Sequence, residues 1–121
     1  MRTHSVMIAL ASNQEQEQHL HIARQQLEHI LAVSKYTEAI WTDPIRSTRP
    51  CRYLNQLLYA ETEMTCEDLE QALKHIERKM GRMPEDREKG IVKIDLDLMR
   101  YDNQRYHLPD WERCYIKNLL I

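Results

Sequence analysis

Residues 91–102, IVKIDLDLMRYD, alternate along the chain, and this alternation restricts the fold more than any other segment. One parity carries the apolar side chains Val92, Ile94, Leu96 and Leu98. The other parity carries Lys93, Asp95, Asp97 and Met99. This pattern predicts a strand that buries the first set of side chains and presents the second. Because aspartate is depleted in strands, the two carboxylates on the presented face require an explanation.

The remaining periodicities predict three more strands and two helices. We expect the strands in residues 6–11, 33–41 and 51–62. Apolar residues at steps of three and four predict two helical faces, formed by Leu20, Ala23, Leu27 and Ile30 and by Leu69, Leu73, Ile76 and Met80. Capping boxes are predicted at the helix starts, from Ser12 with Glu15 and from Thr65 with Asp68. Gly81 predicts the end of the second helix.

The element order β-α-β-β-α-β predicts an α+β chain of the ferredoxin-like arrangement, an antiparallel sheet with both helices packed on one face. Residues 1–121 are expected to form a single domain. Within it, residues 42–50 are expected to be a loop, and residues 103–121 a short strand or turn followed by a helical tail. Because this arrangement hosts many functions, the function has to be inferred from particular side chains.

Composition bears on partners and location. The chain has 17 Lys plus Arg against 19 Asp plus Glu, a formal net charge of −2. This balance gives no electrostatic case for a nucleic-acid or membrane partner. No apolar run reaches membrane-spanning length, and the N-terminal apolar segment is too short for a signal peptide. Because the 3 cysteines are widely spaced and form no C-x-x-C motif, we expect reduced thiols and a cytoplasmic location.

The spacing of Asp95 and Asp97 is compatible with a metal site. Residues i and i+2 of a strand lie about 6.5 Å apart on one face, so the two carboxylates repel each other unless a cation lies between them. Magnesium takes one or two carboxylates together with substrate phosphates, which suits phosphoryl chemistry. Solubilising charges on a solvent-facing edge strand explain the same spacing. The chain's 2 glycines bracket the charged loop 82–90, which is either a lid or an ordinary connector.

Four segments, in this order, resemble the 6-hydroxymethyl-7,8-dihydropterin pyrophosphokinases of folate biosynthesis. They are IALASNQ from Ile8, YLNQLLYAET from Tyr53, HIERKMGR from His75 and KIDLDLMRYD from Lys93. The corresponding family patterns are I-A-L-G-S-N, F/Y-L-N, a helix ending in I-E-x-x-x-G-R before a charged mobile loop, and a strand with D-L-D. The resemblance implies that residues 1–121 form a pyrophosphokinase-like domain with a shortened C-terminal tail.

The resemblance also implies an activity and a set of site residues. Such a protein transfers pyrophosphate from ATP to 6-hydroxymethyl-7,8-dihydropterin and uses two Mg²⁺ ions, so its partners are a small-molecule pterin and ATP. The positions that match catalytic residues are Asp95, Asp97 and Arg82, and the two aspartates also match the metal ligands. The positions that match the pterin site are Thr42, Pro44, Ile45, Tyr53, Asn55 and Tyr115, with the two tyrosines stacking on the ring. The positions near the nucleotide are Glu77, Leu98 and Arg113.

The chain also departs from the family pattern, mainly on the phosphate side. Val92 stands where the family has an arginine, Asp110 replaces a histidine near His107, and Ala11 replaces a glycine. Basic residues that could compensate for the lost arginine are Lys89, Lys93, Arg100 and Arg105. Two alternatives therefore stay open: a catalytically degenerate relative that binds a pterin or nucleotide, and a ferredoxin-like interaction module.

Overall fold

A computed structural model describes residues 2–44 and 51–120 of the chain. The strands are β1 (His4–Ser12), β2 (Ala32–Tyr36), β3 (Ile40–Thr42), β4 (Tyr53–Thr62), β5 (Asp95–Tyr101) and β6 (Gln104–Arg105). The α-helices are α1 (Gln16–Glu28), α2 (Cys66–Lys79) and α3 (Cys114–Leu119). Two 3-10 helices, η1 (Pro84–Asp86) and η2 (Leu108–Glu112), lie in the connections. Within the described ranges, no helix has the length and apolar character needed to cross a membrane.

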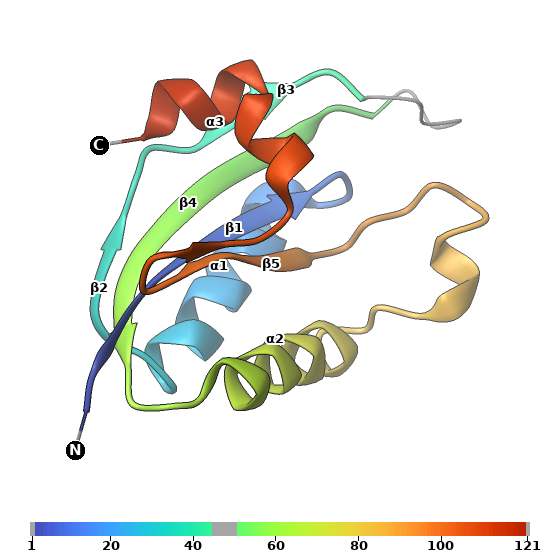
Figure 1. Ribbon diagram of the computed structural model, residues 1–121. Helices are drawn as coiled ribbons and strands as arrows, with labels where there is room; N and C mark the ends of the chain where they lie inside the picture. The colour runs from blue at the N-terminus through green and yellow to red at the C-terminus, as the bar shows by residue number, and fades with distance from the viewer. Residues whose placement is uncertain (1, 45–50, 121) are drawn as a thin grey trace.

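The strands form one antiparallel sheet in the order β2-β4-β1-β5-β6, with β3 also paired to β4. The central strand β1 pairs with β4 on one side and with β5 on the other. Helices α1 and α2 lie together on one face of this sheet (Figure 1). The predicted α+β class and ferredoxin-like arrangement are therefore confirmed.

The core between the sheet and these two helices contains most of the apolar faces that the sequence predicted; the exception at β5 is Val92, which precedes the strand and is only half-buried. It includes Val6, Ile8 and Leu10 of β1, Leu20, Ala23 and Leu27 of α1, Leu69, Leu73 and Ile76 of α2, and Ile94, Leu96 and Leu98 at β5. Each of these side chains is at most 5% exposed. Alternation along β5 therefore places its aspartates on the other face of the sheet.

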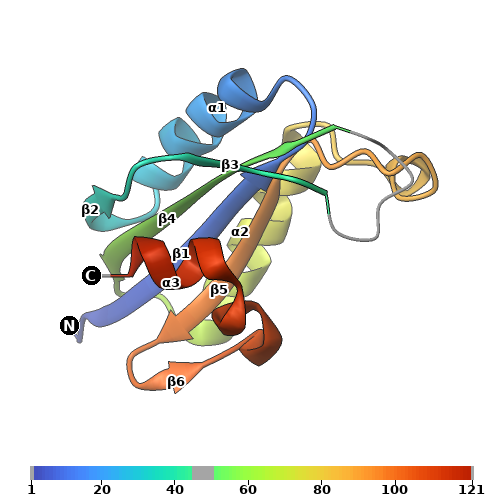
Figure 2. The same cartoon turned by 90° about the horizontal axis from the view of Figure 1, so that it is seen from above.

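That other face is only partly open, because the tail, which forms the predicted short strand and helices, covers part of it. This corrects the prediction that Met99 is presented. Helices η2 and α3 lie across it, on the side opposite α1 and α2 (Figure 2). Their residues Trp111, Ile116 and Leu119 form a second cluster with Met7, Leu57 and Met99. Met99 is consequently 1% exposed rather than presented to solvent.

The helix ends agree with the sequence at α2 and differ at α1. Thr65 caps α2, since its side chain accepts a hydrogen bond from the N–H of Asp68 over 3.1 Å. The capping box predicted from Ser12 and Glu15 is wrong. Ser12 is the last residue of β1 and its hydroxyl donates to the carbonyl of Gln14, while Glu15 has a φ of 45° and makes no side-chain capping bond.

The single strand predicted for residues 33–41 is two strands, β2 and β3. Thr37 lies between them, and its hydroxyl accepts a hydrogen bond from the N–H of Leu57 over 3.0 Å. A side-chain oxygen thus takes the place of a backbone acceptor, which interrupts the ladder to β4. The chain can then turn, and β3 pairs with the other end of β4, opposite Tyr53 and Asn55.

Candidate active site

A cavity of about 600 Å³ lies on the face of the sheet that carries Asp95 and Asp97, and we call it the sheet cavity. Its floor includes Ala9 and Ala11 of β1, and Ala11 is paired with Asn55 on β4 and with Asp95 on β5. The opposite parity of β1 carries larger residues toward the helices. Because alanine side chains are short, this part of the central strand leaves room above the sheet.

One wall of the sheet cavity comes from β3 and β4. Thr42, Tyr53 and Asn55 line it, and Asn55 is 3% exposed. The amide group of Asn55 donates hydrogen bonds to the carbonyl of Ile40 over 3.1 Å and to the hydroxyl of Thr42 over 2.8 Å. Asn55 therefore holds β3 in place as well as lining the cavity. Burial raises the pKa of the Tyr53 hydroxyl, with a further contribution from the charge of Asp95.

The facing wall comes from η2 and α3. Asp110, Arg113 and Tyr115 line it, and Arg113 pairs with Asp110 at 3.2 Å between Nη2 and Oδ1. Burial raises the pKa of the Tyr115 hydroxyl. Two tyrosines, Tyr53 of β4 and Tyr115 of α3, thus line one cavity; the stacking of a flat ring between them stays a prediction.

Asp95 and Asp97 bring two carboxylates to the same cavity. Burial, followed by the charge of Asp95, raises the pKa of Asp97 to about 6. Asp95 is paired with Arg82, with 3.2 Å between its Oδ1 and the Nη1 of the arginine. His107 lies on the other side, with its Nε2 3.8 Å from Oδ1 of Asp97. The negative charge on Asp97 is the less compensated of the two, which suits it to bind a cation.

A second, wider cavity of about 1040 Å³ lies between α2 and the charged loop 82–90, and we call it the loop cavity. It shares Tyr53 and Val92 with the sheet cavity, so the two are adjacent. Its lining carries the basic residues Lys74, Arg78, Arg82 and Arg87 and the acidic residues Glu77, Asp86 and Glu88. Cations therefore outnumber carboxylates in this cavity by one.

The end of α2 positions Glu77 and Arg82 in the lining of this cavity. Gly81 has a φ of 98°, and the N–H groups of Gly81 and Arg82 donate to the carbonyls of Arg78 and Glu77 at 3.0 and 3.1 Å. This is the Schellman arrangement, in which glycine supplies the left-handed residue after the helix. Arg82 is thereby turned back along the helix, and its Nη1 lies 3.0 Å from Oε2 of Glu77.

Several expected positions lie elsewhere. Leu98 is in the core against the helices at 3% exposed, and within the described ranges it lines neither cavity. Pro44 is half-buried and is likewise not in the lining of either cavity. Ile45 lies outside the described residues.

The basic residues that we considered as replacements for the lost arginine are also engaged elsewhere. Lys93 donates to the carbonyl of Gly81 and pairs with Asp86, and Arg100 donates to the carbonyls of Ser5 and Asp102. Arg105 lies over the ring of Trp111, 4.1 Å from its centroid. Lys89, like these three, is outside the lining of both cavities as far as the structure describes it.

Asn13 is a residue whose role sequence reasoning missed. Its amide donates to the carbonyl of Gly90 over 2.8 Å, and its side-chain oxygen accepts from the N–H of Val92 over 2.7 Å. The backbone N–H of Asn13 also donates to the carbonyl of Val92. Asn13 therefore fixes the end of the charged loop to the end of β1. A polar amide directly after an apolar strand was the available signal.

Comparison with known proteins gives a match over nearly the whole chain. Residues 7–119 match the sequence model of the family described as 7,8-dihydro-6-hydroxymethylpterin-pyrophosphokinase (HPPK). The chain is also similar to a folate synthesis bifunctional protein of Arabidopsis thaliana, with 26% identity over 121 residues and 92% of this chain covered. It spans 25% of the length of that relative. Every residue that lines the two cavities lies within the matched range.

Proposed function

Because the chain belongs to the 7,8-dihydro-6-hydroxymethylpterin-pyrophosphokinase family, we propose that it transfers pyrophosphate from ATP to 6-hydroxymethyl-7,8-dihydropterin in folate biosynthesis. The observation that carries this proposal is the contact between the two cavities. One is a pocket lined by two tyrosines and Asn55, the other is a charged groove that carries four basic residues, and both are lined by Tyr53 and Val92. We further propose that residues 1–121 act as one pyrophosphokinase domain.

The pterin would lie in the sheet cavity. Tyr53 and Tyr115 come from opposite walls and suit the two faces of a flat heteroaromatic ring, for which stacking contributes about 1–3 kcal/mol per base in nucleic-acid complexes. An amide such as Asn55 offers both a donor and an acceptor, as the edge of the pterin does. Its amide group already donates to Ile40 and Thr42, so its role in the free protein is to fix this wall.

ATP would lie in the loop cavity with its phosphates toward Asp95. In the transfer, the hydroxymethyl oxygen forms a bond to the β-phosphorus of ATP. The bond from that phosphorus to the oxygen bridging the α-phosphate breaks, AMP leaves, and the hydroxyl proton is released. Phosphoryl transfer depends mainly on positioning and on charge stabilisation. Arg82 suits both roles, because it lines the loop cavity while pairing with Asp95, which lines the sheet cavity.

Asp95 and Asp97 fit the Mg²⁺ ions that the family implies. Their carboxylates supply the oxygen ligands that Mg²⁺ prefers, and the raised pKa of Asp97, caused by burial and by Asp95, reflects negative charge that a cation would relieve. Mg²⁺ held there would neutralise the charge that develops on the transferring phosphates. Arg82 lies beside this pair and is held by Glu77 as well as by Asp95.

The departures from the family pattern favour one alternative, a relative that binds its ligands without turnover. Val92 presents an apolar side chain where the two cavities meet, and Asp110 adds a carboxylate to the sheet cavity, which Asp43, Asp95 and Asp97 also line. Both changes disfavour phosphate binding relative to the arginine and histidine of the family.

An assay of AMP release with the pterin, ATP and Mg²⁺ tests the proposal, beside pterin titration by fluorescence. AMP formed in equal amount with the pterin diphosphate supports the transferase. Pterin binding without AMP release favours the degenerate relative. A failure to bind pterin at millimolar concentration leaves the ferredoxin-like interaction module as the better account.

A further inference from the structure

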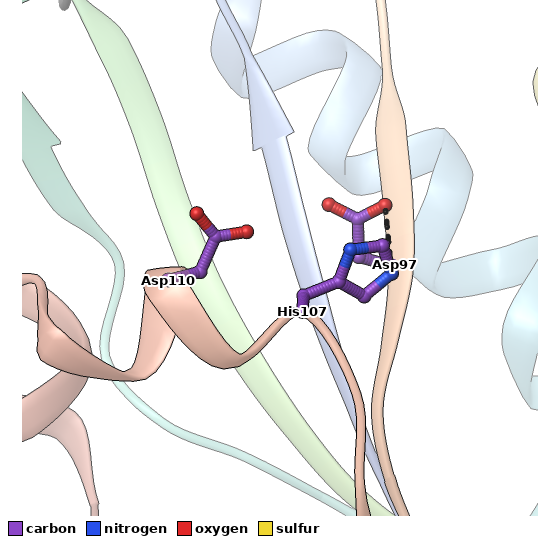
Figure 3. A group of neighbouring side chains, drawn as sticks. All are labelled: Asp97, His107 and Asp110. Carbon is purple, nitrogen blue, oxygen red and sulfur yellow. Dashed lines mark ion pairs between the residues drawn. The ribbon is translucent and has the colours of Figure 1, made fainter.

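Three potential metal ligands from two separate segments meet at the edge of the sheet cavity. Asp97 comes from β5, and His107 and Asp110 come from the segment around η2; Figure 3 shows the imidazole directly beside Asp97, with the Asp110 carboxylate across from them. One ligand atom from each residue lies within 4.8 Å of the other two. The three potential ligands are thus one imidazole and two carboxylates.

His107 and Asp110 belong to one short turn at the start of η2. His107 is the residue before this helix, and the N–H of Asp110 donates to its carbonyl over 2.9 Å. The backbone of His107 is left-handed, with a φ of 54°, so its side chain does not follow the helical repeat. This hydrogen-bonded turn places both ligands on one segment next to Asp97.

Hydrogen bonds to the sheet hold this turn in position next to Asp97. The N–H of Tyr106 donates to the carbonyl of Met99 on β5 over 2.9 Å. The indole N–H of Trp111 donates to the carbonyl of Tyr106 over 2.9 Å, and Trp111 is 6% exposed. The site is therefore built on a fixed backbone rather than on a free loop, and only the side chains have to adjust.

The donor set indicates which ions would bind. Mg²⁺ prefers oxygen ligands, whereas Zn²⁺ and its neighbours bind imidazole nitrogen and carboxylate oxygen at about 2.0–2.2 Å. Two ligands on opposite sides of such an ion are about 4.2 Å apart, and closer in a tetrahedral site. The 3.8 Å between Nε2 of His107 and Oδ1 of Asp97 falls within this limit. His107 is 46% exposed at its side chain, so its ring has room to rotate toward the third ligand.

We propose that Asp97, His107 and Asp110 bind a divalent transition-metal ion, with Zn²⁺ as the reference ion. Arg113 pairs with Oδ1 of Asp110, but a carboxylate has two oxygens and can bind an ion through one while accepting a hydrogen bond through the other. Outer partners of this kind commonly orient metal ligands. The site shares Asp97 with the pair assigned to Mg²⁺, yet it requires neither pterin nor ATP.

The competing explanation is a simple ion pair between protonated His107 and Asp97. Calorimetric titration separates the two, with the EDTA-treated and dialysed protein under a non-thiol reductant, at a pH above the normal range of histidine. We expect Zn²⁺ and Co²⁺ to bind at one site and more tightly than Mg²⁺. The variants His107→Asn and Asp110→Asn should each weaken Zn²⁺ binding by at least tenfold. Asparagine tolerates the left-handed backbone of His107, whose φ is 54°.

Two controls make the result specific to these residues. His75→Asn changes an exposed histidine on α2 and should leave Zn²⁺ affinity unchanged. Cys114 also lines the sheet cavity, so the visible and near-ultraviolet spectrum of the Co²⁺ protein should show no sulfur-to-metal band, and Cys114→Ser should leave it unaltered. The ring resonances of His107 in the unmutated protein should shift on addition of Zn²⁺. Zn²⁺ binding that survives both ligand variants, a cysteine-dependent band, or unshifted His107 resonances would each overturn the proposal.

Discussion

Glu77 on α2 accepts a hydrogen bond from the backbone N–H of Leu96 on β5, with 2.7 Å between Oε2 and the nitrogen. Its side chain is 3% exposed, and it also pairs with Arg82. Burial raises the pKa of Glu77, so its ionised form depends on these partners. The residue that the resemblance placed near a nucleotide is thus also the link between the helix and the strand that carries the aspartates.

Glu77→Ala is therefore expected to lower the free energy of unfolding by about 1–3 kcal/mol, because it leaves a buried N–H without its acceptor. Urea denaturation measures the change. The matched control is Glu70→Ala, an exposed glutamate of the same helix, for which we expect a change within about 0.5 kcal/mol. Equal effects of the two substitutions would contradict a structural role for Glu77.

Asp97 is expected to make the metal-free protein less stable as the pH rises. Burial and the charge of Asp95 raise the pKa of Asp97 from 3.8 to about 6 in the folded protein. The folded state therefore holds this proton more tightly than the unfolded state, and the associated stabilisation is lost between about pH 4 and pH 6. Asp97→Asn in EDTA should raise the free energy of unfolding above pH 6 by about 1–3 kcal/mol and have little effect at pH 4.

Asp102→Asn is a control for this experiment, because we expect it to change the stability of the protein in the opposite direction. The hydrogen bond from His4 lowers the pKa of Asp102, with 2.6 Å between Nδ1 and Oδ2. Its carboxylate therefore contributes stability above the unfolded pKa, which is lost as the pH falls. Removing the charge at Asp102 should lower the melting temperature at neutral pH. If both substitutions shift stability in the same direction, the electrostatic account of Asp97 is wrong.

Tyr53 and Asn55 should differ in how they affect pterin binding. Tyr53→Ala should weaken binding by about 1–3 kcal/mol, a factor of about 5–150, because it removes one stacking face, whereas Tyr53→Phe should retain most of the affinity. Asn55→Ala should cost similar affinity and also lower the melting temperature, because Asn55 holds Ile40 and Thr42 of β3. Fluorescence titration and thermal melting of the three variants measure both quantities. Unchanged pterin affinity in Tyr53→Ala would contradict the placement of the pterin ring in the sheet cavity.

The sequence was sufficient to predict the elements in which apolar residues recur at a regular spacing. On α2 these residues are Leu69, Leu73 and Ile76, and on β5 they are Leu96 and Leu98. Such a spacing predicts a buried face without any knowledge of the element that packs against it. Alternation likewise predicted that the two aspartates share the face opposite this core, and they do line one cavity.

The remainder depends on contacts between distant segments, which no local period records. The burial of Met99 depends on Trp111 and on α3 folding back over the sheet. No periodic pattern in the sequence predicts that Tyr115 and Tyr53 line the same cavity; this was expected only from the family resemblance. Lys74 and Arg78 have the spacing of one helical face, but whether that face meets the loop cavity depends on how α2 packs.

The charged loop 82–90 is expected to exchange its amide hydrogens faster than α1 and α2, because it offers few apolar side chains to bury. The ion pair between Asp86 and Lys93, 3.3 Å apart, holds the middle of the loop, and the bond from Asn13 to Gly90 holds its end. Asn13→Ala should therefore raise exchange in the loop further while leaving α1 unchanged. Hydrogen-exchange mass spectrometry measures both. A loop that exchanges as slowly as the helices in the free protein would count against a lid.

Val92 is the position at which we expect a single substitution to raise activity. Its backbone is fixed on both sides by Asn13, since its N–H donates to the side-chain oxygen and its carbonyl accepts from the N–H of that residue. The side chain therefore stays where the two cavities meet. Val92→Arg restores a cation there and should raise the rate of AMP release by about 100- to 1000-fold, the range found for single transition-state donors.

The matched control is Val92→Met, which adds length without charge and should leave the rate near that of the unmutated protein. Pterin affinity, measured by fluorescence, should change by less than about twofold in either variant, because the expected gain is on the phosphate side. Equal rates for the arginine and methionine variants would show that charge at this position does not limit transfer. A loss of pterin affinity in Val92→Arg alone would instead mean that the new side chain enters the sheet cavity.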